Sequence, residues 1–165
     1  MKFIYDGKTT RIANKTLIST NEGIGLYQVI LEIQSEFGWE VHKTGCAYLN
    51  ENGSFAVKGI FDMASPFSNG LAIVGQNFKM GVINKSARFV LSNAYDVVTP
   101  YTPEEFEKIS SKANIDSRIT KKQLLTLETF KTKIPSNGKL HVKQGQNWQE
   151  VSVAHAMNNN NDLQK

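Results

Sequence analysis

The chain of 165 residues is poor in cysteine and proline, with one cysteine and four prolines. A single cysteine, Cys46, excludes an intrachain disulfide framework and a zinc site built from several cysteines. No stretch approaches the roughly 20 apolar residues of a transmembrane helix, and Met1–Gly7 meets charge too early for a secretory signal. We therefore expect a cytoplasmic protein whose thiol is reduced.

The composition also lacks any strong bias. Hydrophobic residues make up 40%, charged residues 21% and aromatic residues 10%, which excludes collagen-like, coiled-coil and wholly disordered chains. The length suits one domain with a single core. We predict a single domain over residues 1–157, followed by a flexible tail, 158–165, that begins in a run of asparagines.

The stretch Glu22–Phe37 carries apolar residues at helical spacing. These residues are Leu26, Val29, Ile30, Ile33 and Phe37. Residues three and four positions apart share one face of a helix, so the spacing predicts an amphipathic helix. Thr20-Asn21-Glu22 offers capping side chains at its start, and Gly38 is typical of its end.

After Gly38 the pattern changes to short strands and turns, and part of it is repeated. The segment 47–67 aligns without a gap on 81–101, an offset of 34 residues. Identical pairs are Asn50/Asn84, Phe55/Phe89, Asp62/Asp96 and Pro66/Pro100. The register extends backwards to place 37–41 over 71–75. We interpret this as two stacked copies of one strand-rich unit, because a lone hairpin cannot bury its apolar face.

The second copy has a recognisable order of motifs. It reads Phe67-Ser68-Asn69-Gly70-Leu71-Ala72-Ile73-Val74, then Lys79-Met80-Gly81-Val82-Ile83-Asn84, then Tyr95-Asp96. This order resembles the WG (KWG) repeat of many bacterial proteins, over about residues 37–101. The tryptophan that the family places before glycine is Met80 in the second copy and Thr44 in the first. The resemblance implies a binding or scaffolding role, since WG repeats carry no agreed catalytic residues.

Two further helices are expected after Tyr101. Thr102-Pro103-Glu104-Glu105 combines a capping threonine, a proline at the first position and acids at the positive end of the helix dipole. Thr120-Lys121-Lys122-Gln123 resembles a capping box and opens a helix to about Lys133. The fold class predicted is therefore α+β, with antiparallel hairpins from two WG-like repeats packed against an N-terminal helix and two C-terminal helices.

Positive charge is concentrated between Lys108 and Lys143, where nine basic residues face two acidic ones. That segment is net +7 in a chain of net +4, so the remainder is net acidic. The basic helical segment, about 102–134, could form a helix-turn-helix reader of nucleic acid or hold phosphates. The candidate nucleic-acid or anion-binding residues are Arg118, Lys121, Lys122, Lys131 and Lys133. A solvated lysine face is the alternative.

His42 and Cys46 stand four residues apart and could form the thiolate–imidazole pair of a small transferase or hydrolase. The repeat register instead places Gly45-Cys46 at the strand position of Met80, away from any helix N-terminus that would lower the thiol pKa. We therefore interpret Cys46 as a buried structural residue.

No metal site or cofactor is expected. His42, His141 and His155 are far apart in the sequence, with no carboxylate at metal-ligand spacing. Asp62 and Asp96 hold equivalent positions in the repeat, which favours turn-capping side chains over a catalytic carboxylate pair.

These observations favour a non-enzymatic module that binds a protein partner, such as a bacterial or phage immunity, inhibitor or accessory protein. The alternative is a nucleic-acid-binding protein that uses Lys108–Lys143, whose affinity would fall steeply with salt. A weaker alternative is an enzyme built on Cys46 and His42. The oligomeric state and the exposed face of the hairpins stay open.

Overall fold

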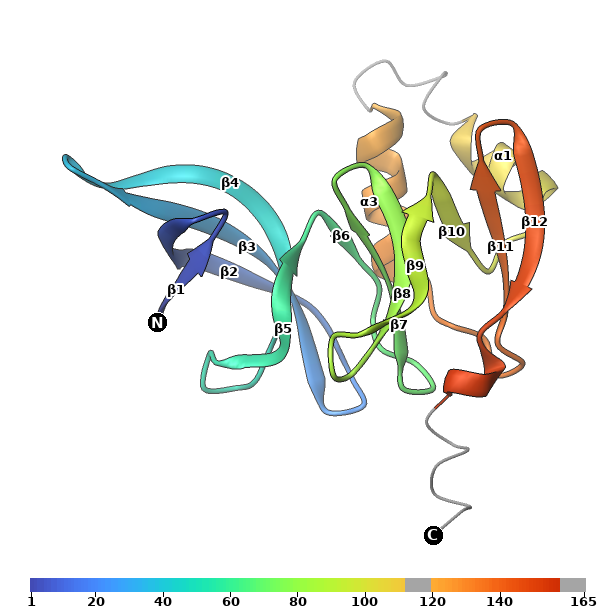
Figure 1. Cartoon of the computed structure of the whole chain (residues 1–165), viewed down its shortest axis with the longest axis horizontal. Coiled ribbons are helices and arrows are strands. Elements are labelled where there is room, and N and C mark those ends of the chain that lie inside the picture. The colour runs from blue at the N-terminus through green and yellow to red at the C-terminus, as the bar shows by residue number, and fades with distance from the viewer. Residues whose placement is uncertain (112–119, 158–165) are drawn as a thin grey trace, which may run out of the picture.

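The computed structural model describes residues 1–111 and 120–157, except for the side chain of Lys121. This part of the chain is mostly antiparallel β structure, with 58% strand and 14% helix (Figure 1). The strands are β1 (Lys2–Tyr5), β2 (Lys8–Asn21), β3 (Ile24–Ser35), β4 (Gly38–Leu49), β5 (Phe55–Phe61), β6 (Met63–Ala64), β7 (Leu71–Gln76), β8 (Lys79–Asn84), β9 (Phe89–Tyr95), β10 (Val97–Thr99), β11 (Lys139–Gln144) and β12 (Asn147–Ser152). The α-helices are α1 (Pro103–Ser110) and α3 (Lys121–Lys131), and a 3₁₀ turn covers Ala154–Ala156. None of the described helices is long and apolar enough to cross a bilayer.

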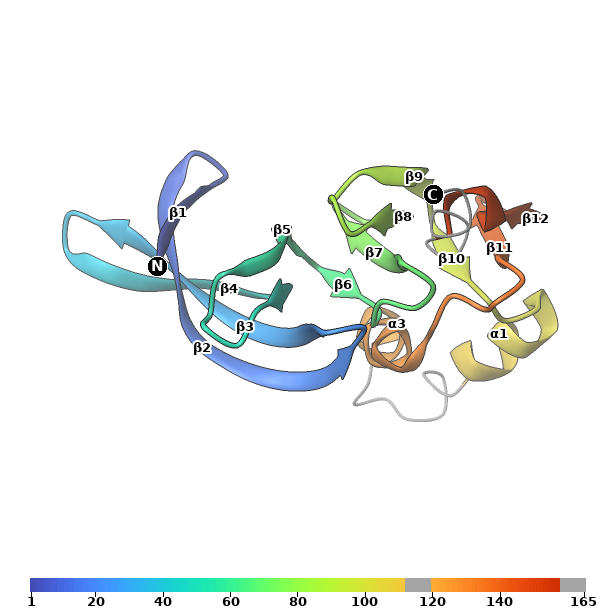
Figure 2. The same cartoon turned by 90° about the horizontal axis from the view of Figure 1, so that it is seen from below.

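Three antiparallel sheets follow one another along the long axis of the molecule (Figures 1 and 2). The first sheet has the order β1-β2-β3-β4-β5, the central sheet β6-β7-β8-β9, and the third sheet β10-β11-β12. A single residue separates the last strand of one sheet from the first strand of the next: Asp62 between β5 and β6, and Asp96 between β9 and β10. Both helices lie on the same side of this row of sheets (Figure 2).

The helix predicted over Glu22–Phe37 is wrong, and with it the α+β fold class, because these residues form β3. Glu22 and Gly23, at φ 54° and 76°, make the tight turn that leads from β2 into β3. The apolar spacing serves two cores on opposite faces of the strand: Leu26 is buried in one, and Val29 and Leu31 in another. When a strand pairs on both edges and is buried on both faces, its apolar residues can fall three and four positions apart, as they do in a helix.

The two C-terminal helices begin at the threonines that the sequence indicates. Thr102 Oγ1 accepts from the Glu105 N–H at 3.2 Å, and Glu105 Oε1 accepts from the Thr102 N–H at 2.8 Å. Thr120 and Gln123 form the same reciprocal pair, at 3.1 and 2.9 Å. The capping box predicted at Thr120 is confirmed, and the capping threonine predicted at Thr102 also forms one. The predicted helix-turn-helix connection, residues 112–119, lies outside the described residues.

The central sheet is buried on both faces, which joins the three sheets into one body. In β7, Ala72 and Val74 pack into a core shared with the first sheet, which also holds Tyr48. Leu71 and Ile73 of the same strand pack into a second core, shared with the third sheet. The unbroken apolar run of β7 follows from this double burial.

The 34-residue repeat is present strand by strand. β9 lies 34 residues after β5, with the same length, and the cross-strand pairs Cys46–Phe61 and Met80–Tyr95 keep the same offset. Cys46, rather than Thr44, therefore occupies the position of Met80. The copies differ at their beginnings: 37–41 lies at the turn and start of β4, whereas 71–75 lies in β7.

A third copy of the hairpin, which was not predicted from the sequence, follows the helices. β11 and β12 lie 68 residues after β7 and β8, twice the repeat length, and all six cross-strand pairs correspond. The turn before each hairpin also repeats, as Ser68-Asn69-Gly70 and Ser136-Asn137-Gly138. That tripeptide is the signal from which the third copy could have been found. The third copy begins 68 residues after the equivalent hairpin, because the helical segment stands where the next 34-residue unit would begin.

The replacement Gly81→Ala should destabilise the central sheet, because a Cβ at Gly81 would lie 2.6 Å from the Leu91 carbonyl oxygen of β9. We expect the free energy of unfolding to fall by about 1–3 kcal/mol, as measured by urea denaturation. Gly75→Ala is the matched control, since its Cβ would lie 3.3 Å from the Met63 Cβ. An equal loss in the two variants would contradict the close approach of β8 and β9 at Gly81.

Candidate functional site

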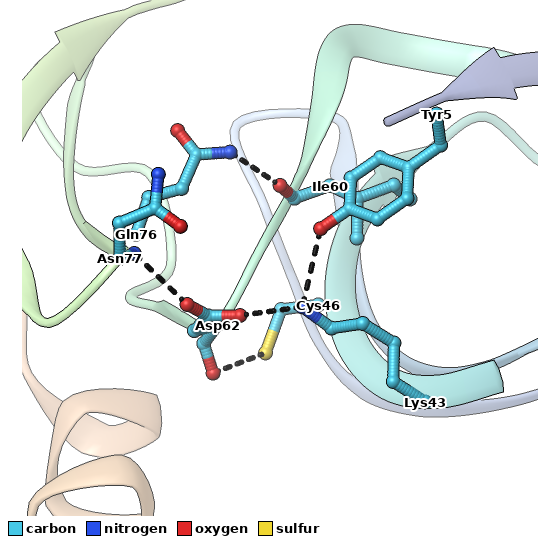
Figure 3. Close-up of polar contacts among 7 residues, drawn as sticks. All are labelled: Tyr5, Lys43, Cys46, Ile60, Asp62, Gln76 and Asn77. Atoms are coloured by element: carbon cyan, nitrogen blue, oxygen red, sulfur yellow. Dashed lines mark hydrogen bonds and ion pairs between the residues drawn. The ribbon is translucent and has the colours of Figure 1, made fainter. Parts of the chain in front are cut away.

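Asp62, at the bend between the first and central sheets, links β4 to the turn between β7 and β8 (Figure 3). Its Oδ1 lies 3.0 Å from the Lys43 Nζ of β4, and its Oδ2 accepts the Asn77 N–H of the β7–β8 turn at 3.1 Å. The Cys46 thiol contacts the Asp62 carbonyl oxygen at 3.9 Å. We call the carboxylate and its two partners the Asp62 latch.

The Asp96 latch repeats this arrangement between the central and third sheets. Asp96 Oδ1 lies 2.6 Å from the Lys79 Nζ, and Oδ2 accepts the Gly145 N–H of the β11–β12 turn at 2.8 Å. A glutamine in each case donates to the carbonyl two residues before the aspartate: Gln76 to Ile60 at 3.0 Å, and Gln144 to Ala94 at 3.2 Å. Both aspartates accept a turn N–H, as predicted, but it comes from the following hairpin, 15 and 49 residues along the chain, and not from the aspartate's own turn.

The two latches hold charged groups in partly covered positions. The Lys79 ammonium and the Gly145 N–H hold the pKa of Asp96 below its ordinary value. Burial lowers the pKa of Lys43, but hydrogen bonds to Tyr5 and Asp62 outweigh burial and raise it overall. Lys43 and Asp96 are therefore charged at neutral pH.

The structure does not bring Cys46 and His42 together as a catalytic pair. Cys46 is 2% exposed, and burial, with a smaller contribution from the charge of Asp62, raises the pKa of its thiol to about 12. His42 is exposed on β4, where its ring contacts Tyr5. Four residues of extended strand span about 13 Å, so no proton passes directly between these side chains.

The predicted basic site is only partly described. Arg118 and the side chain of Lys121 lie outside the described part of the chain. Lys122 is exposed, with its Nζ 5.0 Å from the centre of the Phe78 ring. Lys131 lies 3.9 Å from Glu128, and Lys133 is exposed.

Acidic residues reduce the charge of the basic segment. Lys143 Nζ lies 3.7 Å from Glu107 Oε1, and Lys139 Nζ lies 3.8 Å from Glu150 Oε1. Glu150 follows the segment in sequence and reaches it through the β11–β12 pairing. His141, also beside Glu150, belongs to no group of three potential metal ligands among the described residues.

A cleft of about 650 Å³ opens between β4 and α3, beside the Asp62 latch. Gln28, Gln123 and Thr126 contribute polar groups to its lining, and Leu127 and Phe130 contribute apolar ones. A second cavity, of about 280 Å³, shares Asp62 and Lys122 with the cleft and is also lined by Phe78 and Asp96. The two hollows therefore meet at the Asp62 latch.

Phe78, which was not predicted as a functional residue, lies at this junction. It is 83% exposed and has a φ of 66° in the β7–β8 turn, next to Asn77 at 54°. A bulky residue in the left-handed region is an outlier that costs about 1–2 kcal/mol. The sequence signal was the dipeptide Asn77-Phe78, where a two-residue hairpin turn ordinarily carries glycine.

Residues 47–79 match the family described as the WG containing repeat. This segment is similar to a WG repeat. It runs from the end of β4 to the start of β8, and it includes Asp62, Asn77 and Phe78. The resemblance read from the sequence motifs is confirmed. No curated protein and no solved structure matches the chain.

The Asp96 latch should make stability depend on pH. Because folding lowers the pKa of Asp96, its contribution is present above the unfolded-state pKa and is lost as the pH falls through the folded-state pKa. We expect Asp96→Asn to lower the urea midpoint at pH 7 and to reduce its fall between pH 7 and pH 3. Glu51→Gln, in the exposed β4–β5 turn, is the control. An unchanged pH profile in Asp96→Asn would contradict the latch.

Cys46 should be nearly inert towards alkylation in the folded protein. At a pKa of about 12, roughly one thiol in ten thousand is ionised at pH 8. We expect iodoacetamide to modify the native protein at least about a hundredfold more slowly than the urea-unfolded chain, as followed by mass spectrometry. Comparable alkylation rates in the native and unfolded states would show that the Cys46 thiol is reactive and would support the enzyme hypothesis.

Proposed function

We propose that this chain is a non-enzymatic module that binds a protein partner through the surface around Phe78. The observation that carries the proposal is an aromatic side chain that is 83% exposed and held at a φ of 66°. Backbone strain of this kind is typical of functional sites, where the surrounding structure imposes it. Here Phe78 is the second residue of the two-residue β7–β8 turn, whose first residue, Asn77, also has positive φ and donates its N–H to Asp62 Oδ2.

A second exposed apolar side chain lies close to the same junction. Leu127 of α3 is 49% exposed and lines the cleft. Lys122 lines both hollows and places its ammonium against the Phe78 ring. Large side chains beside a hollow are typical hot spots of protein interfaces, because a partner that covers them excludes water from a concave surface. Phe78 and Leu127 are therefore the proposed anchors.

The chemistry of the cleft suits a peptide segment. Gln28, Gln123 and Thr126 offer amide and hydroxyl groups that both donate and accept, as the main chain of a bound segment requires. Lys122 forms no ion pair with a described carboxylate, which leaves its charge for an acidic side chain. We expect a partner segment with an apolar residue for Phe78 and an acidic residue for Lys122.

The described geometry gives the two alternatives less support. A thiol with a pKa of about 12, buried against the Asp62 carbonyl, is almost entirely protonated at neutral pH, which argues against its use as a nucleophile. Ion pairs with Glu107, Glu128 and Glu150 offset lysines on which nucleic-acid binding would depend.

Phe78→Gly should separate binding from folding. We expect it to weaken the partner complex at least about tenfold, with the free energy of unfolding unchanged or up to about 1 kcal/mol higher, because glycine adopts positive φ without a Cβ clash. Phe37→Gly is the matched control, since it removes a ring that is 85% exposed in the β3–β4 turn. Affinity capture with mass spectrometry identifies the partner, and calorimetry with the purified partner measures each affinity.

Unchanged affinity in both Phe78→Gly and Leu127→Asp would overturn the proposal. Purification of nucleic acid in place of protein, with an affinity that falls steeply with salt, would favour the nucleic-acid alternative. The identity of a captured partner then decides between an immunity, an inhibitor and an accessory role.

A further inference from the structure

The third sheet lacks one strand of the repeated unit. In the central sheet the order is β6-β7-β8-β9, and the corresponding strands of the third sheet are β10-β11-β12. No described residue occupies the place beyond β12 that β9 occupies beyond β8. In Figure 1, β12 lies at the outer end of the row of sheets.

The backbone groups that face outward from β12 follow from its hairpin. In antiparallel pairs, hydrogen-bonded and non-hydrogen-bonded positions alternate, and a two-residue turn is closed by a hydrogen-bonded pair, here Gln144–Asn147. The N–H and C=O groups of Trp148, Glu150 and Ser152 therefore point away from β11. The corresponding residues of β8 behave in this way: the Asn84 N–H donates outward to the Arg88 carbonyl at 2.9 Å.

This edge carries few of the features that protect other edge strands from pairing. β5 and β9 are paired with shifts in register, and β6 and β10 are only two and three residues long. β12 makes six consecutive regular pairs and contains neither lysine nor proline. Natural edges are usually blunted by short length, bulges, lysine or proline, and a regular edge without them is a template for another strand.

We propose that β12 is a strand-acceptor edge, which binds an extended, antiparallel segment of a protein partner by main-chain pairing. β9 shows the chemistry of such an occupant, because its Phe89 and Tyr95 lie opposite Ile83 and Met80 of β8. The corresponding positions of β12 are Val151 and Trp148. The bound segment therefore carries an apolar side chain opposite Val151 and an aromatic one opposite Trp148.

A basic side chain in the bound segment would complement the edge further. Glu150 is exposed between the two apolar positions, at the place of Val82 in β8, and Val82 lies opposite Leu91 of β9. A lysine or arginine opposite Glu150 would pair with its carboxylate and set the register of the segment. The residues of this edge are not those of the Phe78 surface, so the two proposals stand separately.

Amide hydrogen exchange in the free full-length chain is the first test. We expect the Trp148 and Glu150 amides to exchange at least about tenfold faster than those of Gln149 and Val151, which are bonded to β11. Equal protection of all four amides in the free protein would show that the edge is already occupied, and would overturn the proposal.

The second test selects ligands for the full-length chain from a displayed library of random 12-residue peptides. We expect selected peptides with alternating apolar residues to protect the Trp148 and Glu150 amides. Glu150→Pro removes an outward N–H without breaking a bond to β11, and should weaken binding at least tenfold. Glu150→Thr is the matched control, which keeps the N–H, and should retain binding within a factor of about three.

The outcomes of the selection distinguish this proposal from that for Phe78. Peptides that bind Phe78→Gly normally and Glu150→Pro weakly support the strand-acceptor edge. Peptides with the opposite pattern support only the Phe78 surface and overturn the edge. Failure to select any peptide that protects the Trp148 amide also overturns it. If Glu150→Pro does not fold, the exchange protection of the wild-type complex decides the question.

Discussion

The carboxylates at the two bends are the interactions on which the arrangement of the three sheets depends. Each aspartate stands where the chain leaves one sheet and enters the next, and each accepts a backbone N–H from the hairpin turn ahead of it. A lysine neutralises each carboxylate, at 3.0 Å for Asp62 and 2.6 Å for Asp96. The latch therefore defines the distance between a bend and the next hairpin. The buried faces of β7 can then pack against both neighbours.

The first latch also connects the fold to the proposed function. By holding the Asn77 N–H, Asp62 fixes the turn in which Phe78 is exposed at positive φ. On the other side of Asp62, the buried Cys46 thiol contacts its carbonyl oxygen, so the cysteine packs into the base of the site. The contacts of Asp62 that join two sheets therefore also hold the β7–β8 turn at this junction.

Local signals in the sequence were sufficient for some features. The capping boxes at Thr102 and Thr120 depend on residues three positions apart, and the 34-residue repeat depends on identities such as Asp62 and Asp96. The β3 strand was misread, because burial in two cores on opposite faces produces apolar spacings of three and four. The site was missed because its parts, β4, the β7–β8 turn and α3, are far apart in sequence.

The helix starts could be predicted from the sequence because each depends on residues three positions apart, and two copies of the repeated unit could be predicted because they align without a gap. The partners of the two aspartates could not, because Asn77 lies 15 residues after Asp62 and Gly145 lies 49 residues after Asp96. The β character of residues 24–35, the junction at Phe78 and the open edge of β12 became apparent only from the three-dimensional structure. Each of these depends on which distant strand or helix lies alongside, and burial and long-range pairing outweigh local preference there.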